Sequence, residues 1–136
     1  MEFKLSGFVT RTNITYVQPL ETEIGFSRAV RIGNVIAVTG TAPIAPDGTV
    51  SHVGDPYGQA KRCLEIIEDV LRQAEASLAD IIRTRIFLKN IDDWKEVARA
   101  HGETFSDIQP ACTFVEVKGF INPDWLVEIE ADAIVE

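Results

Sequence analysis

Two segments of the chain carry apolar residues at the spacing of an α-helix. The first begins after Asp55, a good N-cap residue, with Pro56 at the first helical position, and its pattern ends near Ala76. The second begins after Asp92 or Asp93, either of which is a candidate N-cap. Apolar residues recurring every three or four positions form one stripe on each helix: Ala60, Cys63, Leu64, Ile67, Leu71 and Ala74 on the first, and Trp94, Val97, Ala98, His101 and Phe105 on the second.

Shorter segments with the composition of β-strands surround these helices. They are residues 14–17, 27–33, 35–39, 83–88, 112–117 and 126–135. The Gly33-Asn34 turn signal between the second and third of them predicts a hairpin. The order strands, helix, strand, helix, strands predicts the α+β class, with two helices packed on one face of a mixed sheet. We expect residues 1–136 to form one domain.

The last strand has two chemically different faces. Alternate residues of a strand point to opposite sides of a sheet, and here one set is apolar and the other acidic: Val127, Ile129, Ala131 and Ala133 against Glu128, Glu130 and Asp132. The apolar set is expected to face the helices. The acidic set is either a solvated outer face, which the pattern alone favours, or it borders a pocket in which one carboxylate does chemistry.

Composition argues against several classes of function. The chain of 136 residues has a formal net charge of −8, and its densest basic stretch is Arg83–Arg85, too small for a protein that neutralises phosphates. No apolar run reaches the ~18 residues of a membrane span. The N-terminus lacks the apolar stretch of a signal peptide, so we expect a soluble cytoplasmic protein. Because Cys63, Cys112, His52 and His101 do not lie at metal-ligand spacing, we expect no metal.

Two stretches near the C-terminus are similar to a known family signature. Residues 110–117, Pro-Ala-Cys-Thr-Phe-Val-Glu-Val, and residues 127–131, Val-Glu-Ile-Glu-Ala, resemble the pattern of the RidA (YjgF, endoribonuclease L-PSP) family. That pattern runs Pro-Ala-Arg-Ser/Thr, Val-Glu-Val and then Ile-Glu-Ile-Glu-Ala. Weaker similarities lie at residues 38–41, 59–60 and 87–90. Together the segments are fairly specific.

The resemblance implies a chorismate-mutase-like fold and a homotrimer with active clefts between subunits. It also implies hydrolysis of reactive imines and enamines, with a small metabolite as ligand and no cofactor. Glu128 matches the family's water-positioning glutamate, and Thr39 matches a hydroxyl that lines the pocket. Gly40 matches a glycine that lets the backbone approach the ligand closely. No nucleic acid or membrane partner is expected.

Two positions depart from the family pattern. Cys112 stands where the family's deaminases have an arginine that clamps a substrate carboxylate, and cysteine cannot supply the planar guanidinium fork. Phe26 stands where they have a pocket tyrosine, so that hydroxyl is missing. We therefore expect a divergent subgroup, with an altered substrate or with binding alone.

Other residues have competing interpretations. Arg28 is either a replacement anchor or a surface charge, and general burial tendencies favour the surface charge. His101 on its apolar stripe is more typical of a core histidine than of a catalyst. Cys112 with His101 as its base would make a nucleophile, but cysteine more often acts as a small hydrophobe. Trp94 and Trp125 are interpreted as packing and loop-anchoring residues.

Three functions follow from these residues. The first is an imine or enamine hydrolase with an altered substrate. The second is a non-catalytic trimer that binds a small metabolite in its interface clefts, and the loss of the arginine at Cys112 favours it. The third, an endoribonuclease, is disfavoured by the acidic balance. Glu128 supports the first, because a site built only to bind an anion would not place a carboxylate there.

Overall fold

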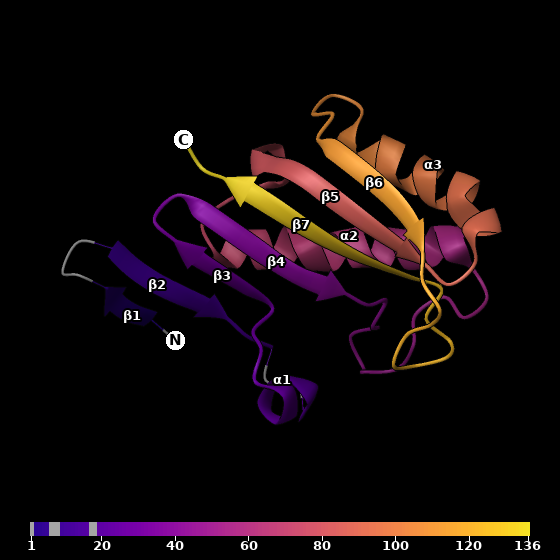
Figure 1. The fold of residues 1–136 in the computed structure, drawn as a ribbon, viewed down its shortest axis with the longest axis horizontal. Helices are drawn as coiled ribbons and strands as arrows, with labels where there is room; N and C mark the ends of the chain where they lie inside the picture. Colours follow the sequence, from indigo (N-terminus) through magenta and orange to yellow (C-terminus); the bar gives the residue numbers. More distant parts are fainter. Residues whose placement is uncertain (1, 6–8, 17–18) are drawn as a thin grey trace.

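The computed structural model describes residues 2–5, 9–16 and 19–136. These residues form a seven-stranded mixed sheet in the order β1-β2-β3-β4-β7-β5-β6, in which only β5 and β6 are parallel (Figure 1). The strands are β1 (Glu2–Leu5), β2 (Val9–Ile14), β3 (Ala29–Ile32), β4 (Val35–Thr41), β5 (Ile81–Leu88), β6 (Ala111–Glu116) and β7 (Val127–Ile134). The α-helices are α1 (Pro19–Ile24), α2 (Pro56–Gln73) and α3 (Trp94–Phe105), and 3-10 turns occupy Leu78–Asp80 and Ile91–Asp93.

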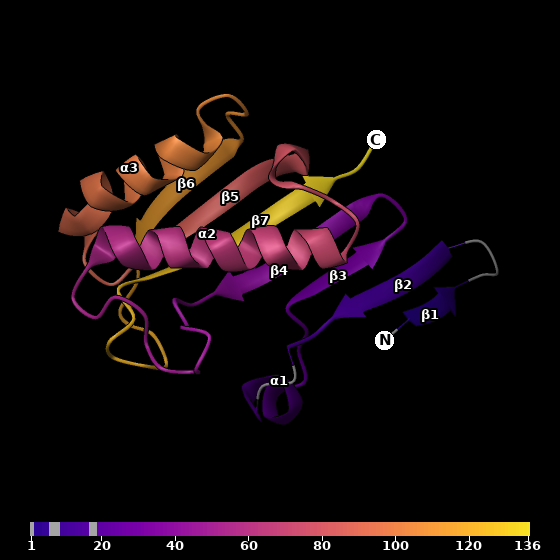
Figure 2. The ribbon, with the colours of Figure 1, turned by 180° about the vertical axis from the view of Figure 1, so that it is seen from behind.

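Both long helices cover the same face of the sheet, as predicted. Figure 2 shows α2 crossing in front of the middle strands and α3 lying beside β5 and β6. The apolar face of β7 is fully buried beneath them: Val127, Ile129, Ala131 and Ala133 are each 0% exposed. The fold is therefore of the α+β class with a mixed sheet, and the hairpin of β3 and β4 around Gly33 is present. Among the described residues, no helix is both long and apolar enough to span a bilayer.

The two ends of α2 are stabilised by different residues. At the start, the Asp55 carboxylate accepts a hydrogen bond from the Gly58 backbone N–H at 3.0 Å, which confirms the predicted N-cap. A side chain at Gly58 would collide with the His52 ring and the Asp55 carboxylate, so glycine is required there. At the other end, Arg31 of β3 donates from Nη1 to the Ala74 carbonyl at 2.7 Å. This places a positive charge at the negative end of the helix dipole.

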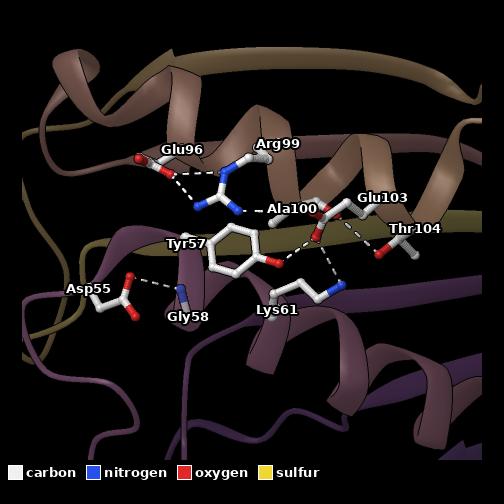
Figure 3. Close-up of polar contacts among 9 residues, drawn as sticks. All are labelled: Asp55, Tyr57, Gly58, Lys61, Glu96, Arg99, Ala100, Glu103 and Thr104. Atoms are coloured by element: carbon white, nitrogen blue, oxygen red, sulfur yellow. Dashed lines mark hydrogen bonds and ion pairs between the residues drawn. The ribbon is translucent and has the colours of Figure 1, made fainter.

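A polar cluster joins α2 to α3 on their exposed side (Figure 3). The Tyr57 hydroxyl donates to the Glu103 carboxylate, which also accepts from Lys61 at 3.5 Å. The Arg99 guanidinium lies 3.6 Å from the centroid of the Tyr57 ring and pairs with Glu96 at 2.7 Å. The hydrogen bond from Tyr57, with help from Lys61, lowers the pKa of Glu103. Because exposed ion pairs contribute little stability, the cluster mainly fixes how the two helices lie against each other.

The N-terminal elements differ from the prediction. The strand expected at residues 14–17 lies earlier in the sequence, as β2. This strand pairs antiparallel with β3, and the paired residues end at Ile14. Tyr16 leaves the ladder: its backbone N–H donates to Glu21 at 3.1 Å and its hydroxyl donates to Asp69. Residue 17 lies outside the described residues. Neither β1 nor the short helix α1 was predicted, since this mixed stretch has no apolar period.

The start of α3 also differs. Asp93 occupies the N-cap position of α3, but its side chain makes no capping hydrogen bond. Instead, Asn90 accepts a hydrogen bond from the Asp92 backbone N–H at 2.9 Å and caps the 3-10 turn before the helix. The extra turn moves the cap upstream of both predicted aspartates.

Candidate functional site

A cavity of about 270 Å³ lies where β4 and β7 meet α1, the middle of α2 and the segments before β3, after β4 and before β7. Its walls are mainly apolar, with a few polar groups, which is the usual make-up of small-molecule sites. Its size suits a ligand of few heavy atoms. The lining residues are Tyr16, Leu20, Ile24, Phe26, Arg28, Gly40, Ala42, Ile44, Ala45, Pro46, Arg62, Ile66, Ile121, Trp125 and Glu128.

Glu128 brings a carboxylate to this cavity. The alternation of β7 buries Val127 and Ile129 in the core and turns Glu128 to the opposite side. Its Oε1 lies so close to β4 that a Cβ on Gly40 would be only 3.0 Å away. Glycine at position 40 therefore leaves the space that the carboxylate occupies, and both residues line the cavity.

The surroundings of Glu128 change its acidity. Burial raises the pKa of the Glu128 carboxyl above its ordinary value. The positive charge of Arg28 opposes this shift, and the negative charge of Glu130 adds to it. A half-buried carboxyl with a raised pKa can accept a proton and return it at a pH closer to neutrality than an exposed one.

The acidic face of β7 is therefore divided into two parts. Glu130 and Asp132 do not line the cavity but accept hydrogen bonds from Arg85 Nη1 of β5, at 3.2 and 3.1 Å. Arg83 Nε lies 4.0 Å from Asp132. Glu130 and Asp132 thus belong to a partly exposed ion-pair network, as expected for an outer face, whereas Glu128 borders a cavity.

Arg28 is buried, not exposed as general tendencies suggested. Its residue exposure is 8%. Nη2 donates to Thr41 Oγ1 at 3.2 Å and lies 3.5 Å from the Gly40 carbonyl. Burial lowers the pKa of the guanidinium, while Glu21 and Glu128 raise it. Arginine still stays protonated in proteins, so a positive charge faces Glu128 across the cavity.

Two further polar residues line the cavity without a clear signal in the sequence. Tyr16 is held by its hydrogen bond to Asp69, and burial followed by that bond raises the pKa of its hydroxyl. Arg62 of α2 donates from Nε to the Ile44 carbonyl at 2.7 Å, and Nη1 lies 3.5 Å from Glu65. Position 62 lies next to the apolar stripe of α2, which is the only sequence hint of its place.

Trp125 enters the cavity wall from the loop between β6 and β7. Buried Gln59 holds this loop: its Nε2 donates to the Asp124 carbonyl at 3.0 Å, and its Oε1 accepts from the Leu126 N–H at 2.8 Å. Trp125 is 7% exposed, so its interpretation as a loop anchor agrees with the structure but overlooks the cavity. Trp94 is 46% exposed, so the packing interpretation is wrong for that residue.

Two other predicted site residues lie nearby, Phe26 in the segment before β3 and Thr39 on β4. Phe26 lines the cavity, at the place where the family pattern has tyrosine. Thr39 lies next to Gly40 on β4 but does not line the cavity of the described chain. Its backbone N–H donates to the Arg28 carbonyl at 3.0 Å, and its own carbonyl accepts from Thr41. In this chain Thr39 supports the wall rather than forming it.

Cys112 lies apart from these residues. It is exposed on the edge strand β6, separated from β7 by β5, and does not line the cavity of the described chain. His101 shares a hydrogen bond of 2.8 Å with Thr84 Oγ1 and stacks on Phe105, and burial lowers its pKa. His101 is thus hydrogen-bonded and partly buried, which agrees with a structural rather than a catalytic interpretation, and the structure records no Cys112–His101 contact among the described residues.

The cavity groups define what chemistry is available. The described residues contain no group of three or more His, Cys, Asp or Glu placed to hold a metal ion. The cavity does offer a carboxyl with a raised pKa, a buried guanidinium and apolar walls. These groups can bind a small organic molecule and position a water molecule beside it.

Comparison with known proteins agrees with the fold. A family model described as endoribonuclease L-PSP matches residues 17–135. A RutC family protein of Pyrococcus abyssi is 36% identical over 111 residues, covering 82% of this chain and 87% of the relative. The 3-aminoacrylate deaminase RutC of Acinetobacter baylyi is 35% identical over 107 residues, covering 79% and 84%. Among solved structures, Rv2704 of Mycobacterium tuberculosis, a member of the YjgF/YER057c/UK114 family, is 42% identical with a TM-score of 0.83, over 92% of this chain and 99% of that chain.

Proposed function

The chain belongs to the RidA (YjgF, endoribonuclease L-PSP) family, and from this premise we propose that it hydrolyses small imines or enamines in the cavity beside Glu128. The observation that carries the proposal is the position of this carboxylate. It is half-buried, has a raised pKa and lines a small apolar cavity. A relative of similar length is named a 3-aminoacrylate deaminase, an enzyme of an enamine substrate.

In the proposed reaction, Glu128 accepts a proton from the attacking water and later donates it to the substrate nitrogen. Water held by the carboxylate adds to the carbon of the protonated imine, and its proton passes to Glu128. The carboxyl then gives this proton to the nitrogen. The C–N bond breaks with its electrons leaving on ammonia, and the hydroxyl passes its proton to the Glu128 carboxylate as the C=O bond forms. Release of this proton to solvent restores the carboxylate and balances the proton that the imine had taken up. The net change is an imine and water giving a carbonyl compound and ammonia. An enamine enters this sequence after it has tautomerised to the imine.

The other parts of the proposed site have supporting roles. Gly40 leaves room for the Glu128 carboxylate, Phe26 forms part of the wall, and Thr39 supports β4. In the proposed homotrimer, Cys112 of a neighbouring subunit borders the cleft that the single chain leaves open. Because Phe26 and Cys112 lack the hydroxyl and the charge of the family pattern, the proposed substrate is altered, or is held by other side chains, relative to the family's arginine-bearing deaminases.

A trapping assay tests this function. Imines are generated in situ from several amino acids with an amino-acid oxidase, and the imine that survives is trapped with semicarbazide. The wild-type protein should reduce the trapped fraction, and Glu128→Gln should lower its rate by roughly 10²- to 10⁴-fold. Exposed Glu68 of α2 provides the matched control, since Glu68→Gln removes the same charge outside the cavity. If wild-type protein and buffer give equal trapping for every imine, the proposal fails and the non-catalytic binding protein becomes the better account.

A further inference from the structure

Two buried hydrogen-bond donors beside the cavity have no acceptor. Within the described residues, Arg28 Nε and Trp125 Nε1 are the buried side-chain nitrogen or oxygen atoms without a partner. The two residues come from opposite ends of the sequence, yet both line the cavity. Buried polar groups are nearly always paired, so two orphan donors at one site call for an explanation.

Described residues satisfy only part of the hydrogen-bonding capacity of the Arg28 guanidinium. Its hydrogen bonds to described residues come from Nη2, to Thr41 and the Gly40 carbonyl, and its guanidinium carbon lies 5.8 Å from the centroid of the Phe26 ring. Nε and Nη1 therefore carry three N–H groups that no described residue accepts. More than nine-tenths of the surface of Arg28 is buried. The residue forms no salt bridge with a carboxylate of the described chain. Glu21 and Glu128 are near enough to act on its charge, but neither is in contact with it as an ion pair.

A buried, unpaired charge is costly for a fold. Removing a guanidinium from water costs several kcal/mol unless an anion and hydrogen bonds replace the lost hydration. The hydroxyl of Thr41 replaces only a small part of it. A ligand that carries a negative charge and two acceptor oxygens would satisfy the remaining donors. Arginine is suited to this role because its planar fork matches a carboxylate.

We propose that Arg28, with Trp125 Nε1 as a second donor, is the carboxylate anchor of the cavity, and that the ligand is a small monocarboxylate with a short apolar side chain. The anchor that the family pattern places at position 112 is thus supplied from within the same chain by position 28. The apolar remainder of the ligand contacts side chains such as Ile44 and Ile66. This inference rests on the proposed function only in using the same cavity.

The charges of the cavity select a monoanion. Glu128 lines the same space and repels a dianion such as phosphate. Arg62, the other arginine of the wall, is a weaker candidate for the anchor. Its Nε already donates to the Ile44 carbonyl and its Nη1 pairs with Glu65.

Calorimetric titration with a matched pair of ligands tests the anchor. The probes are 4-methyl-2-oxopentanoate, a stable 2-oxo acid of the proposed product class, and its neutral amide. Wild-type protein should bind the acid at least about tenfold more tightly than the amide, as expected for a charge-assisted pair. Arg28→Gln should remove this preference, and Arg28→Lys should reduce it because the fork is lost. Arg62→Gln should keep the preference, and Arg99→Gln provides an exposed control.

Several outcomes would overturn the assignment. Equal binding of the acid and the amide by the wild-type protein would overturn it. This result needs no variant, so it holds even if the Arg28 variants misfold. Loss of the preference in Arg62→Gln but not in Arg28→Gln moves the anchor to α2. Tighter binding of inorganic phosphate than of the acid contradicts the monoanion. Binding is independent of turnover: a protein that prefers the acid through Arg28 but hydrolyses no imine disproves the proposed function and leaves this inference standing.

Discussion

Glu128 and Glu130 show how far the surroundings of a residue can differ over two positions. Both lie on the same face of β7, but Glu128 lines the cavity while Glu130 pairs with Arg85 at 3.2 Å. The alternation of the strand was predicted from the sequence because period two needs only local residues. The division between a cavity carboxylate and an ion-pair network was not, because it depends on Arg28, just before β3, and on Arg85 of β5, both distant in sequence.

The burial of Arg28 could not be predicted from the sequence. General tendencies place arginine at the surface, and the sequence gives no sign that Thr41 and the Gly40 carbonyl receive its guanidinium. A small bulge in the pairing of β4 with β7 lies between Val38 and Thr41, beside these contacts. Such irregularities are set by the packed sheet and not by local propensity.

The raised pKa of Glu128 predicts a stability effect with a definite sign. Its folded-state pKa lies above its unfolded value, so the stabilising contribution is present below the unfolded pKa and is lost as pH rises through the folded pKa. Glu128→Gln should therefore raise the melting temperature near neutral pH by a few degrees. The difference from wild type should disappear in acid. Calorimetry at both pH values checks this. A Glu128→Gln protein that is less stable than wild type at neutral pH would show that the partly buried, ionised carboxylate does not destabilise the fold.

At the scale of elements, α2 is the best-determined part of the fold. Its apolar stripe and its Asp55 cap follow from the sequence, because both are local, whereas the helix ends at Gln73, before the predicted end near Ala76. Its C-terminal partner was not predictable, since Arg31 lies on β3, more than forty residues earlier. Short α1 and β1 were also not predicted, because elements of a few residues take their stability from their neighbours and not from periodicity.

The contact between Arg31 and the end of α2 gives an element-scale prediction. Arg31→Gln should lower the free energy of unfolding by about 0.5–1.5 kcal/mol, because it removes a charged donor from the Ala74 carbonyl. Urea unfolding measures the change. The matched control is Arg72→Gln in the last turn of α2, where the arginine side chain is 68% exposed and, among the described residues, forms an ion pair with Asp69 alone. An unchanged free energy of unfolding in Arg31→Gln would mean that Arg31 does not stabilise the helix end.

At the scale of the whole molecule, one face of the sheet is left uncovered by helices. It faces the viewer in Figure 1. Three apolar side chains on this face are substantially exposed: Val35 at 56%, Val115 at 41% and Ile134 at 43%. The fold class followed from the order of elements alone, but the cavity did not. It assembles residues from 16 to 128, and only the folded sheet brings them together.

The uncovered face supports the prediction of a homotrimer. We expect sedimentation equilibrium to give three times the chain mass of 15.0 kDa at micromolar concentration. Val115→Asp should shift the protein toward smaller species, because it places a charge in the apolar part of the expected interface. Asp substituted for exposed Val53, which lies in a loop, is the control. A wild-type protein that sediments as a monomer would contradict both the trimer and the clefts shared between subunits.

The central claim, that Glu128 acts as a base on water in an imine hydrolase, is tested most directly by the pH dependence of one rate ratio. The ratio of the wild-type rate to the Glu128→Gln rate cancels the solution chemistry of the imine itself. Because burial raises the pKa of Glu128, the ratio should be near one in acid and rise to a plateau. Its midpoint should lie above the ordinary glutamate value of about 4.3. A ratio that stays near one, or that is large but independent of pH, would contradict the role of this carboxylate.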